Sequence, residues 1–281
     1  MLELLPPQTL KFSGGESTSF LNSLIKAPPD WSRVRTFDIT DVTFITPVIA
    51  SIAGVFNSLG WDILPPRNKG ARSYLDYMLG VHEDTDATRY IPVINCAQKI
   101  VVLCHAEKIR SILRGWVSSS VAEDINYSLS ETMDNVFDHA RSAEGLWLQT
   151  QKYPNLNKIE IALIDRGRGV AQSLADNPAF SSLSDEDRFG HALELGVSAN
   201  PSCHSGEGLS STLEWLKKNR TAGARAVLIS MNNLFFTGKT TTGVMTLENI
   251  CWPGTFLWFA IPYNPPVSLS DTWVSLGLSD D

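Results

Sequence analysis

The spacing of apolar residues divides the chain into two parts with different patterns. The first 66 residues mix short strands with two helical patterns, one beginning after Ser17 and the other at Thr46-Pro47, with Gly60 placed to end the second. These patterns predict a small α/β unit. Its expected elements are a strand at 10–12, a helix that includes 20–24, a strand at 34–39, a helix at 48–59 and a strand at 61–64.

Residues 67–89 are polar and contain glycine, which predicts a connector with one short helix around 74–79. From residue 90 the pattern predicts an α+β domain, a two-layer α/β sandwich in which a mixed sheet has its helices on one face. Residues 264–281 are rich in proline and serine and predict a loosely packed tail. The elements expected in the domain at 90–263 are strands at 91–95, 100–103, 145–150, 158–164, 224–231, 244–248 and 255–261, and helices at 106–117, 121–140 and 209–219.

Composition narrows the class of protein. The 281 residues are 43% hydrophobic and 19% charged, as in globular domains, and no stretch approaches the roughly 20 apolar residues of a membrane span. The N-terminus lacks a secretion-signal pattern, and four cysteines without CxxC spacing fit a reducing cytoplasm. A net charge of −7 disfavours nucleic-acid and anionic-membrane partners. An acidic protein that binds a polyanion needs a local device, such as helix N-termini or a divalent cation.

The helix expected at 121–140 carries the first candidate chemistry. Glu131, Asn135 and His139 advance by about 40° each and form one stripe, separate from the apolar stripe. A carboxylate there could orient a water or hydroxyl for attack on phosphorus, and an amide oxygen could ligate Mg²⁺. A solvated helix face is the simpler explanation of these three residues taken alone. The apolar stripe comprises Ile125, Leu129, Met133, Val136 and Ala140.

A second candidate follows the continuously apolar strand at 158–164. The strand delivers Asp165 to its end, and Gly167 and Gly169 then allow the backbone to approach a ligand closely. A carboxylate at this place could accept a hydrogen bond from the exocyclic amine of adenine. A tight turn after a strand explains the same residues.

Two further segments could complete a site. Gly206 and Gly208 precede the helix that begins at Leu209, and the exposed N–H groups of such a helix start attract phosphate. Thr255, at the start of a strand, could join Asp165 with its hydroxyl. An ordinary glycine-capped helix and an ordinary strand threonine are the alternatives. No Walker loop occurs in the chain.

The order and separation of these segments resemble the GHKL superfamily of nucleotide-binding proteins. Glu-x-x-x-Asn, Asp-x-Gly-x-Gly, Gly-x-Gly-Leu and Gly-Thr follow one another within residues 90–263, and 130–139 is particularly similar to the corresponding helix of anti-sigma-factor serine kinases. The resemblance implies a Bergerat-type ATP-binding fold with ATP and Mg²⁺ as cofactors. Glu131 would be the general base and Asn135 the Mg²⁺ ligand. The other residues implied to contact the nucleotide are His139, Asp165, Gly167, Gly169, Val170, Gly206, Gly208, Leu209 and Thr255.

Two other segments of the chain also resemble parts of known protein families. Residues 171–204, which include Gly196-Val-Ser198, would be the mobile ATP lid of the family. Residues 36–48 resemble the central strand–turn–helix of STAS domains, which makes 1–66 a STAS-like α/β domain and implies partner-switching regulation with a protein partner. Pro47 stands where that family carries a phosphorylatable serine, and Thr46 is a weak substitute. A plain α/β core strand explains this segment almost as well.

Three functions are compatible with these motifs. The presence of Glu131 favours an enzyme of the GHKL superfamily, either an ATPase or a Ser/Thr protein kinase. A non-catalytic, ATP-gated interaction module is the alternative. A histidine kinase that uses His139 as phosphoacceptor ranks below both, because residues 1–89 do not form the pattern of a helical hairpin. Dimers are common among the relatives, and the sequence fixes neither the oligomeric state nor the partner.

Overall fold

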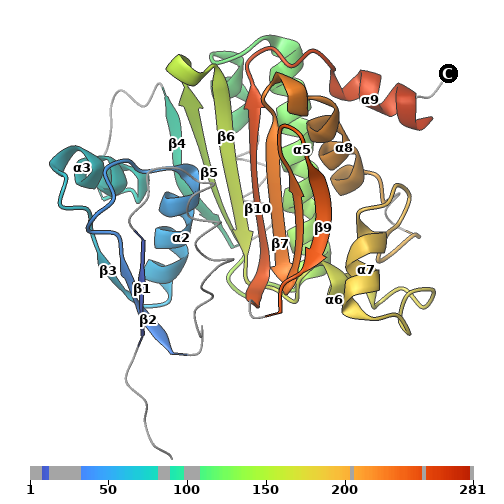
Figure 1. Cartoon of the computed structure of the whole chain (residues 1–281), viewed down its shortest axis with the longest axis horizontal. Helices are drawn as coiled ribbons and strands as arrows, with labels where there is room; N and C mark the ends of the chain where they lie inside the picture. Colours follow the sequence, from blue (N-terminus) through green and yellow to red (C-terminus); the bar gives the residue numbers. More distant parts are fainter. Residues whose placement is uncertain are drawn as a thin grey trace, which may run out of the picture.

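The computed structural model describes residues 8–12, 33–81, 89–97, 108–202, 206–248 and 251–278. Over these residues the chain has an α+β fold, with one seven-stranded sheet, one three-stranded sheet and helices packed on both faces of the larger sheet (Figure 1). Within the same residues, no helix combines the length and apolar character that crossing a bilayer requires.

The large sheet is antiparallel throughout. Its strand order is β4-β5-β6-β10-β7-β8-β9. The expected mixed sheet is therefore wrong: β6 and β7 run in the same direction, but β10 lies between them and pairs antiparallel with both. The strands are β4 (Tyr90–Cys96), β5 (Leu146–Tyr153), β6 (Lys158–Asp165), β7 (Arg225–Met231), β8 (Asn233–Thr237), β9 (Thr242–Thr246) and β10 (Trp252–Pro262).

One face of the large sheet is covered by α5 (Ser119–Asn135), α8 (Gly208–Lys218) and a helix over residues 108–114. Ser118 caps α5 by accepting from the Val121 N–H, at 3.4 Å. The apolar stripe predicted on this helix is confirmed, because all five of its side chains are buried against the sheet. Burial of this stripe leaves Glu131 and Asn135 on a different side of α5.

The front unit, residues 8–12 and 33–81, covers the opposite face (Figure 1). It contains a parallel sheet of β1 (Gln8–Lys11), β2 (Val34–Asp38) and β3 (Asp62–Leu64). Its helix α2 (Pro47–Ser58) packs directly on β5 and β6 of the large sheet. The described helices of residues 90–263 pack together on the other face, as expected for that domain. The structure adds a layer because α2 buries apolar side chains along nearly its whole length and shares one core with the large sheet.

Several local predictions are confirmed and others need correction. Thr46 caps α2, and Gly60 ends it with a φ of 70°. The predicted connector carries a longer helix than expected, α3 (Lys69–Met78), whose Leu75 and Met78 are buried. Strand β8 was not predicted. The helix expected after Ser17 and the strand expected at 100–103 lie outside the described residues.

The C-terminal segment is not loosely packed. Residues 269–276 form α9 (Leu269–Leu276), which begins with a capping box between Ser268 and Asp271. Leu269 is buried, and the Val267 carbonyl accepts hydrogen bonds from Trp215 Nε1 and Asn219 Nδ2, both at 2.9 Å. Proline and serine here start a helix, because serine is a good N-cap residue as well as a loop residue.

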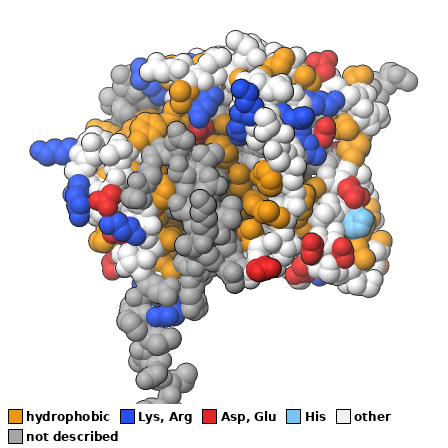
Figure 2. All heavy atoms as spheres, viewed as in Figure 1, with side chains coloured by type: hydrophobic (Ala, Val, Ile, Leu, Met, Phe, Trp, Pro, Cys, Tyr) orange, Lys and Arg blue, Asp and Glu red, His pale blue; other side chains and the backbone are white. Residues whose placement is uncertain are grey.

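Figure 2 shows hydrophobic side chains at the surface over the part of the large sheet that ends at β9. Val244 and Met245 of β9 are 50% and 46% exposed. In the sheet β9 is separated from β10 by β7 and β8, and the candidate site described below lies between the strands β6 and β10 and the helices α5 and α8.

Candidate functional site

A cavity of about 300 Å³ lies between the C-terminal half of α5, strands β6 and β10, and the beginning of α8. This volume is at the lower end of the roughly 300–1,000 Å³ found for small-molecule sites. Every residue predicted for the site lines it except Gly167. The predicted residues that line the cavity are Glu131, Asn135, His139, Asp165, Gly169, Val170, Gly206, Gly208, Leu209 and Thr255.

The helix that carries the first three of these residues changes its geometry within the site. α5 ends at Asn135 and continues as a π-helical turn, η1 (Val136–Ala140), where an unbroken α-helix was expected. The turn is held from outside: the His139 carbonyl accepts from Arg168 Nε at 2.8 Å and from Ser173 Oγ at 3.1 Å. The wider turn breaks the regular advance predicted from Asn135 to His139, yet both side chains still reach the cavity.

The first turn of α8 approaches Glu131 closely. A Cβ built on Gly208 would lie 2.0 Å from Glu131 Oε2, so any larger residue at this position would displace the Glu131 side chain. Tyr127 lies one turn earlier on α5, and burial, followed by the negative charge of Glu131, raises the pKa of its hydroxyl to about 12. Tyr127 was not predicted, since a tyrosine facing a helix groove has no signature in the sequence.

Asp165 is the most deeply buried acid in the cavity, with 2% of its surface exposed. The Gly167 N–H donates to its Oδ1 at 2.7 Å, and Thr255, its partner in the β6–β10 ladder, also hydrogen-bonds the carboxylate. Burial raises the pKa of Asp165 to about 6, although the hydrogen bonds from Gly167 and Thr255 oppose this rise. The predicted pairing of Asp165 with Thr255 is therefore present in the structure.

The glycines after Asp165 serve backbone packing. A Cβ on Gly167 would lie 2.2 Å from the Ala140 carbonyl oxygen, so Gly167 lets the end of η1 dock on this loop. Gly169 has a φ of 80°, and its Cβ would meet Ser230 Oγ at 2.6 Å. Gly254 has the same kind of role, because its Cβ would lie 2.3 Å from the Asp165 carbonyl oxygen.

Ser230 supports the site without lining the cavity, and it was not predicted from the sequence. It is fully buried on β7, and its Oγ accepts from the Val170 N–H at 2.7 Å. This contact ties the loop after β6 to a strand that is separated from it by β10 along the sheet edge. Nothing local marks such a serine, because its partner lies far away in the sequence.

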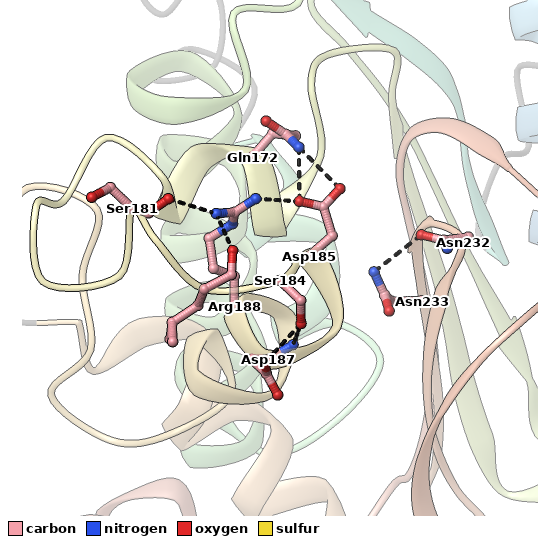
Figure 3. Close-up of polar contacts among 9 residues, drawn as sticks. Gln172, Ser181, Ser184, Asp185, Asp187, Arg188, Asn232 and Asn233 are labelled. Atoms are coloured by element: carbon pink, nitrogen blue, oxygen red, sulfur yellow. Dashed lines mark hydrogen bonds and ion pairs between the residues drawn. The ribbon is translucent and has the colours of Figure 1, made fainter.

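Residues 171–202 of the predicted lid segment are among the described residues. The segment forms α6 (Val170–Leu174) and α7 (Asp185–Ala192), where a loop was expected. Arg188 of α7 is buried and bonds Asp185 and the carbonyls of Ser181 and Leu183 (Figure 3). Gln172 of α6 donates to Asp185 at 2.8 Å, which links the two helices.

The far end of the same segment reaches the cavity. Val197, Ser198 and Ala199 line it, and Asn177 Nδ2 donates to the Ser198 carbonyl at 2.8 Å. A Cβ on Gly206 would lie 2.5 Å from the Val197 backbone, so the segment packs on the approach to α8. His204, the predicted end of the lid, lies outside the described residues. The mobility of the segment stays a prediction.

The donors in the cavity suit Mg²⁺ better than a transition metal. In the described part of the chain, no three or more His, Cys, Asp or Glu residues gather as a metal site. Asn135 and Glu131 both line the cavity and offer oxygen atoms. Mg²⁺ is commonly held by one or two protein oxygens together with substrate phosphates and water, so this sparse oxygen set fits it.

Neither models of known protein families, nor curated proteins, nor solved structures match this chain. The function of the cavity is therefore inferred from its own chemistry. Its wall carries polar and apolar groups together, as is usual in small-molecule sites. The apolar part includes Leu146, Leu163, Leu228 and Leu257 on the sheet, together with Val170 and Leu209.

Proposed function

We propose that this chain is a GHKL-type protein with a Bergerat-type fold that binds Mg-ATP in the cavity and hydrolyses it or transfers its γ-phosphate to a protein serine or threonine. The proposal rests on the meeting of four separate sequence motifs at one cavity. Four segments singled out in the sequence, at 131–139, 165–170, 206–209 and 255, contribute to the wall of a single cavity. Solvated helix faces and ordinary turns would have no reason to meet in this way.

The Asp165 end of the cavity suits adenine. A buried carboxylate that is ionised above a pKa of about 6 accepts a hydrogen bond from an exocyclic amine at neutral pH. The Thr255 hydroxyl beside it adds a second polar contact. Leu163 and Leu257, on the sheet wall, can pack against a planar ring. Guanine, with a carbonyl where adenine has its amine, would place two acceptors against each other.

The α8 end suits phosphate. α8 begins at Gly208, and no side chain caps its first turn, so the N–H groups there are available to an anion. Asn135 would hold Mg²⁺, which supplies neutralisation of the phosphate charge when bound. His139 lies on the same wall as Asn135. Glu131 lies against the first turn of α8 and would accept a proton from the attacking water or hydroxyl. The oxygen of that water or hydroxyl would then form a bond to the γ-phosphorus, and ADP would leave.

The front unit suggests where a protein partner would act. Its β2–α2 segment is the STAS-like part of the chain, but the Thr46 hydroxyl is buried and accepts from the Ile49 N–H at 3.4 Å. Thr46 is thus a helix cap and a poor phosphoacceptor. Partner-switching regulation in this protein would use surface contacts of the front unit in place of phosphorylation at α2.

Calorimetry with Mg-ATP tests the proposal. The wild-type protein is expected to bind, and Asp165→Asn is expected to bind at least about tenfold more weakly, since one hydrogen-bonded charge is lost. Absence of heat in folded wild-type protein at saturating Mg-ATP would reject the proposal. Formation of ADP over multiple turnovers then separates an enzyme from an ATP-gated interaction module, which binds without turnover.

A further inference from the structure

Residues 197–199, called here the wall segment, form one side of the candidate cavity. Ser198, in the middle of the segment, is buried, and its carbonyl accepts a hydrogen bond from Asn177 Nδ2 at 2.8 Å. Within the described part of the chain, no other hydrogen bond joins residues 195–200 to a distant stretch of sequence. Asn177 therefore makes the main polar contact that fixes the wall segment in place.

Asn177 is itself held in one orientation. It lies between α6 and α7, and its Oδ1 accepts from the Ala179 N–H at 3.0 Å, which turns Nδ2 toward the wall segment. Its neighbour Asp176 forms an ion pair with Arg168 of the loop after β6. Arg168 also donates through Nε to the His139 carbonyl at 2.8 Å. The residue that holds the wall segment is thus connected to the segments that form the rest of the site.

The approach to α8 supports the wall segment by packing. A Cβ on Gly206 would lie 2.5 Å from the carbonyl carbon and oxygen of Val197, so the two backbones are in close contact. The wall segment is therefore packed against Gly206 and hydrogen-bonded to Asn177. The cavity that it borders has a volume of about 300 Å³, and an outward shift of the segment would enlarge it.

We propose that Asn177 is a positioning residue that holds the wall segment against the cavity before any ligand binds. Asn177 does not line the cavity, so it acts through the Ser198 carbonyl. This arrangement differs from a lid that becomes ordered only with nucleotide, because the part next to the site is already in place. A wall that is fixed in advance lowers the entropy cost of binding. The consequence for Mg-ATP rests on the proposed function, whereas the hydrogen bond does not.

Two substitutions separate this role from a purely structural one. Asn177→Asp keeps an oxygen that can accept the Ala179 N–H, but it replaces the donor with a second oxygen that faces the Ser198 carbonyl. Asn177→Ala removes both contacts. If Asn177 served only to form its local turn, the aspartate would behave as the wild type does. If it holds the wall segment, both variants should release the segment.

Hydrogen exchange of the full chain without nucleotide, followed by mass spectrometry of peptides that cover 193–202, tests the contact. Exchange there should be about fivefold faster or more in Asn177→Asp and in Asn177→Ala, since the segment opens more often. Asn155→Asp is the matched control, because it adds the same charge at an exposed position of the 3-10 helix η2 (Pro154–Leu156) and should exchange as the wild type does. Wild-type exchange in a folded Asn177→Asp would overturn the proposal.

Calorimetry and kinetics with Mg-ATP test the consequence for binding. Asn177→Asp should bind about three- to tenfold more weakly and raise KM by a similar factor, while kcat should change less than about twofold because Asn177 is remote from the reacting atoms. Wild-type affinity in this variant would refute the part assigned to ligand binding. The two proposals fail separately: absence of Mg-ATP binding by the wild type removes the proposed function, and unchanged exchange in Asn177→Asp removes this inference.

Discussion

Gly208 and Glu131 are in direct contact: a methyl group on the glycine would lie 2.0 Å from the carboxylate oxygen and 2.8 Å from Glu131 Cβ. Gly208 is the first residue of α8, and Glu131 lies in α5. The contact holds the N–H groups of one helix start beside the carboxylate of another helix. In the proposed reaction the N–H groups would bind phosphate, and the carboxylate would activate the attacking water or hydroxyl.

Gly208→Ala tests the importance of this contact. The new methyl should push the carboxylate aside and separate the two helices slightly, lowering kcat by about tenfold or more and stability by about 1–3 kcal/mol. Gly190→Ala in α7 is the control, because nothing lies within 4 Å of the added Cβ. That variant should keep full turnover and gain about 0.5–1 kcal/mol. Equal turnover by Gly208→Ala and the wild type would contradict the assigned geometry.

Glu131→Gln separates binding from chemistry. The amide keeps the size of the side chain but has no basic carboxylate, so turnover should fall by about 10²–10⁴-fold. Affinity for Mg-ATP should stay within about threefold, since the nucleotide is held by other residues. Calorimetry and ADP release measure the two quantities. A variant that releases ADP as fast as the parent would show that another group is the base.

Gly254→Ala should disrupt the Asp165 end of the cavity. Gly254 has a φ of 104°, and its Cβ would lie 2.3 Å from the Asp165 carbonyl oxygen, a backbone atom that cannot rotate away. We expect a loss of at least about 3 kcal/mol, measured by urea denaturation. Gly223→Ala is the control: its φ is 115°, but nothing lies within 4 Å, so only the backbone strain of about 1 kcal/mol applies. Equal losses in the two variants would mean that the close approach to Asp165 has no cost.

The raised pKa of Asp165 predicts a pH dependence of stability. The unfolded chain ionises this group near its ordinary pKa of 3.8, but the folded protein does so only near 6, because burial disfavours the charge. The folded state therefore binds more protons between these values, and the stability contributed by Asp165 below pH 3.8 is lost as pH rises through about 6. The shift corresponds to a change on the order of 3 kcal/mol.

Asp165→Asn isolates this contribution, since the amide does not titrate. The free energy of unfolding of the wild type minus that of the variant should decrease between pH 4 and pH 7, as measured by urea denaturation at each pH. A difference that stays constant across this range would contradict the raised pKa. Acids with lowered pKa values, such as Asp176, titrate in both proteins and cancel in the difference.

Local signals made much of the fold predictable. Thr46-Pro47 and Gly60 mark the two ends of α2 because capping depends on a few neighbouring residues, and the structure has both. The buried stripe of α5 follows from helical periodicity alone. The motif residues likewise occupy one cavity, since each segment brings its own glycine or polar side chain to the end of a helix or strand.

The features that escaped prediction depend on contacts between distant segments. The place of β10 between β6 and β7 decides that the sheet is antiparallel, and no window of sequence contains all three strands. Ser230 and Tyr127 have their contacts on other elements, with the Val170 N–H and the Trp273 ring respectively. In the π-helical turn η1, the His139 carbonyl accepts from Arg168 and Ser173, which come about 30 residues later in the chain.

The packing of α2 on β5 and β6 determines which fragments of the protein can be expressed in folded form. Residues 90–263 expressed without the front unit would present Trp147, Ile164 and Trp258 to water, all of them buried in the complete chain. Such a fragment would be prone to precipitate, and heat should melt the whole molecule in one cooperative transition. The front unit and residues 90–263 are thus expected to unfold together. A truncation at residue 90, although it keeps all the motifs, would cut through the core that they share.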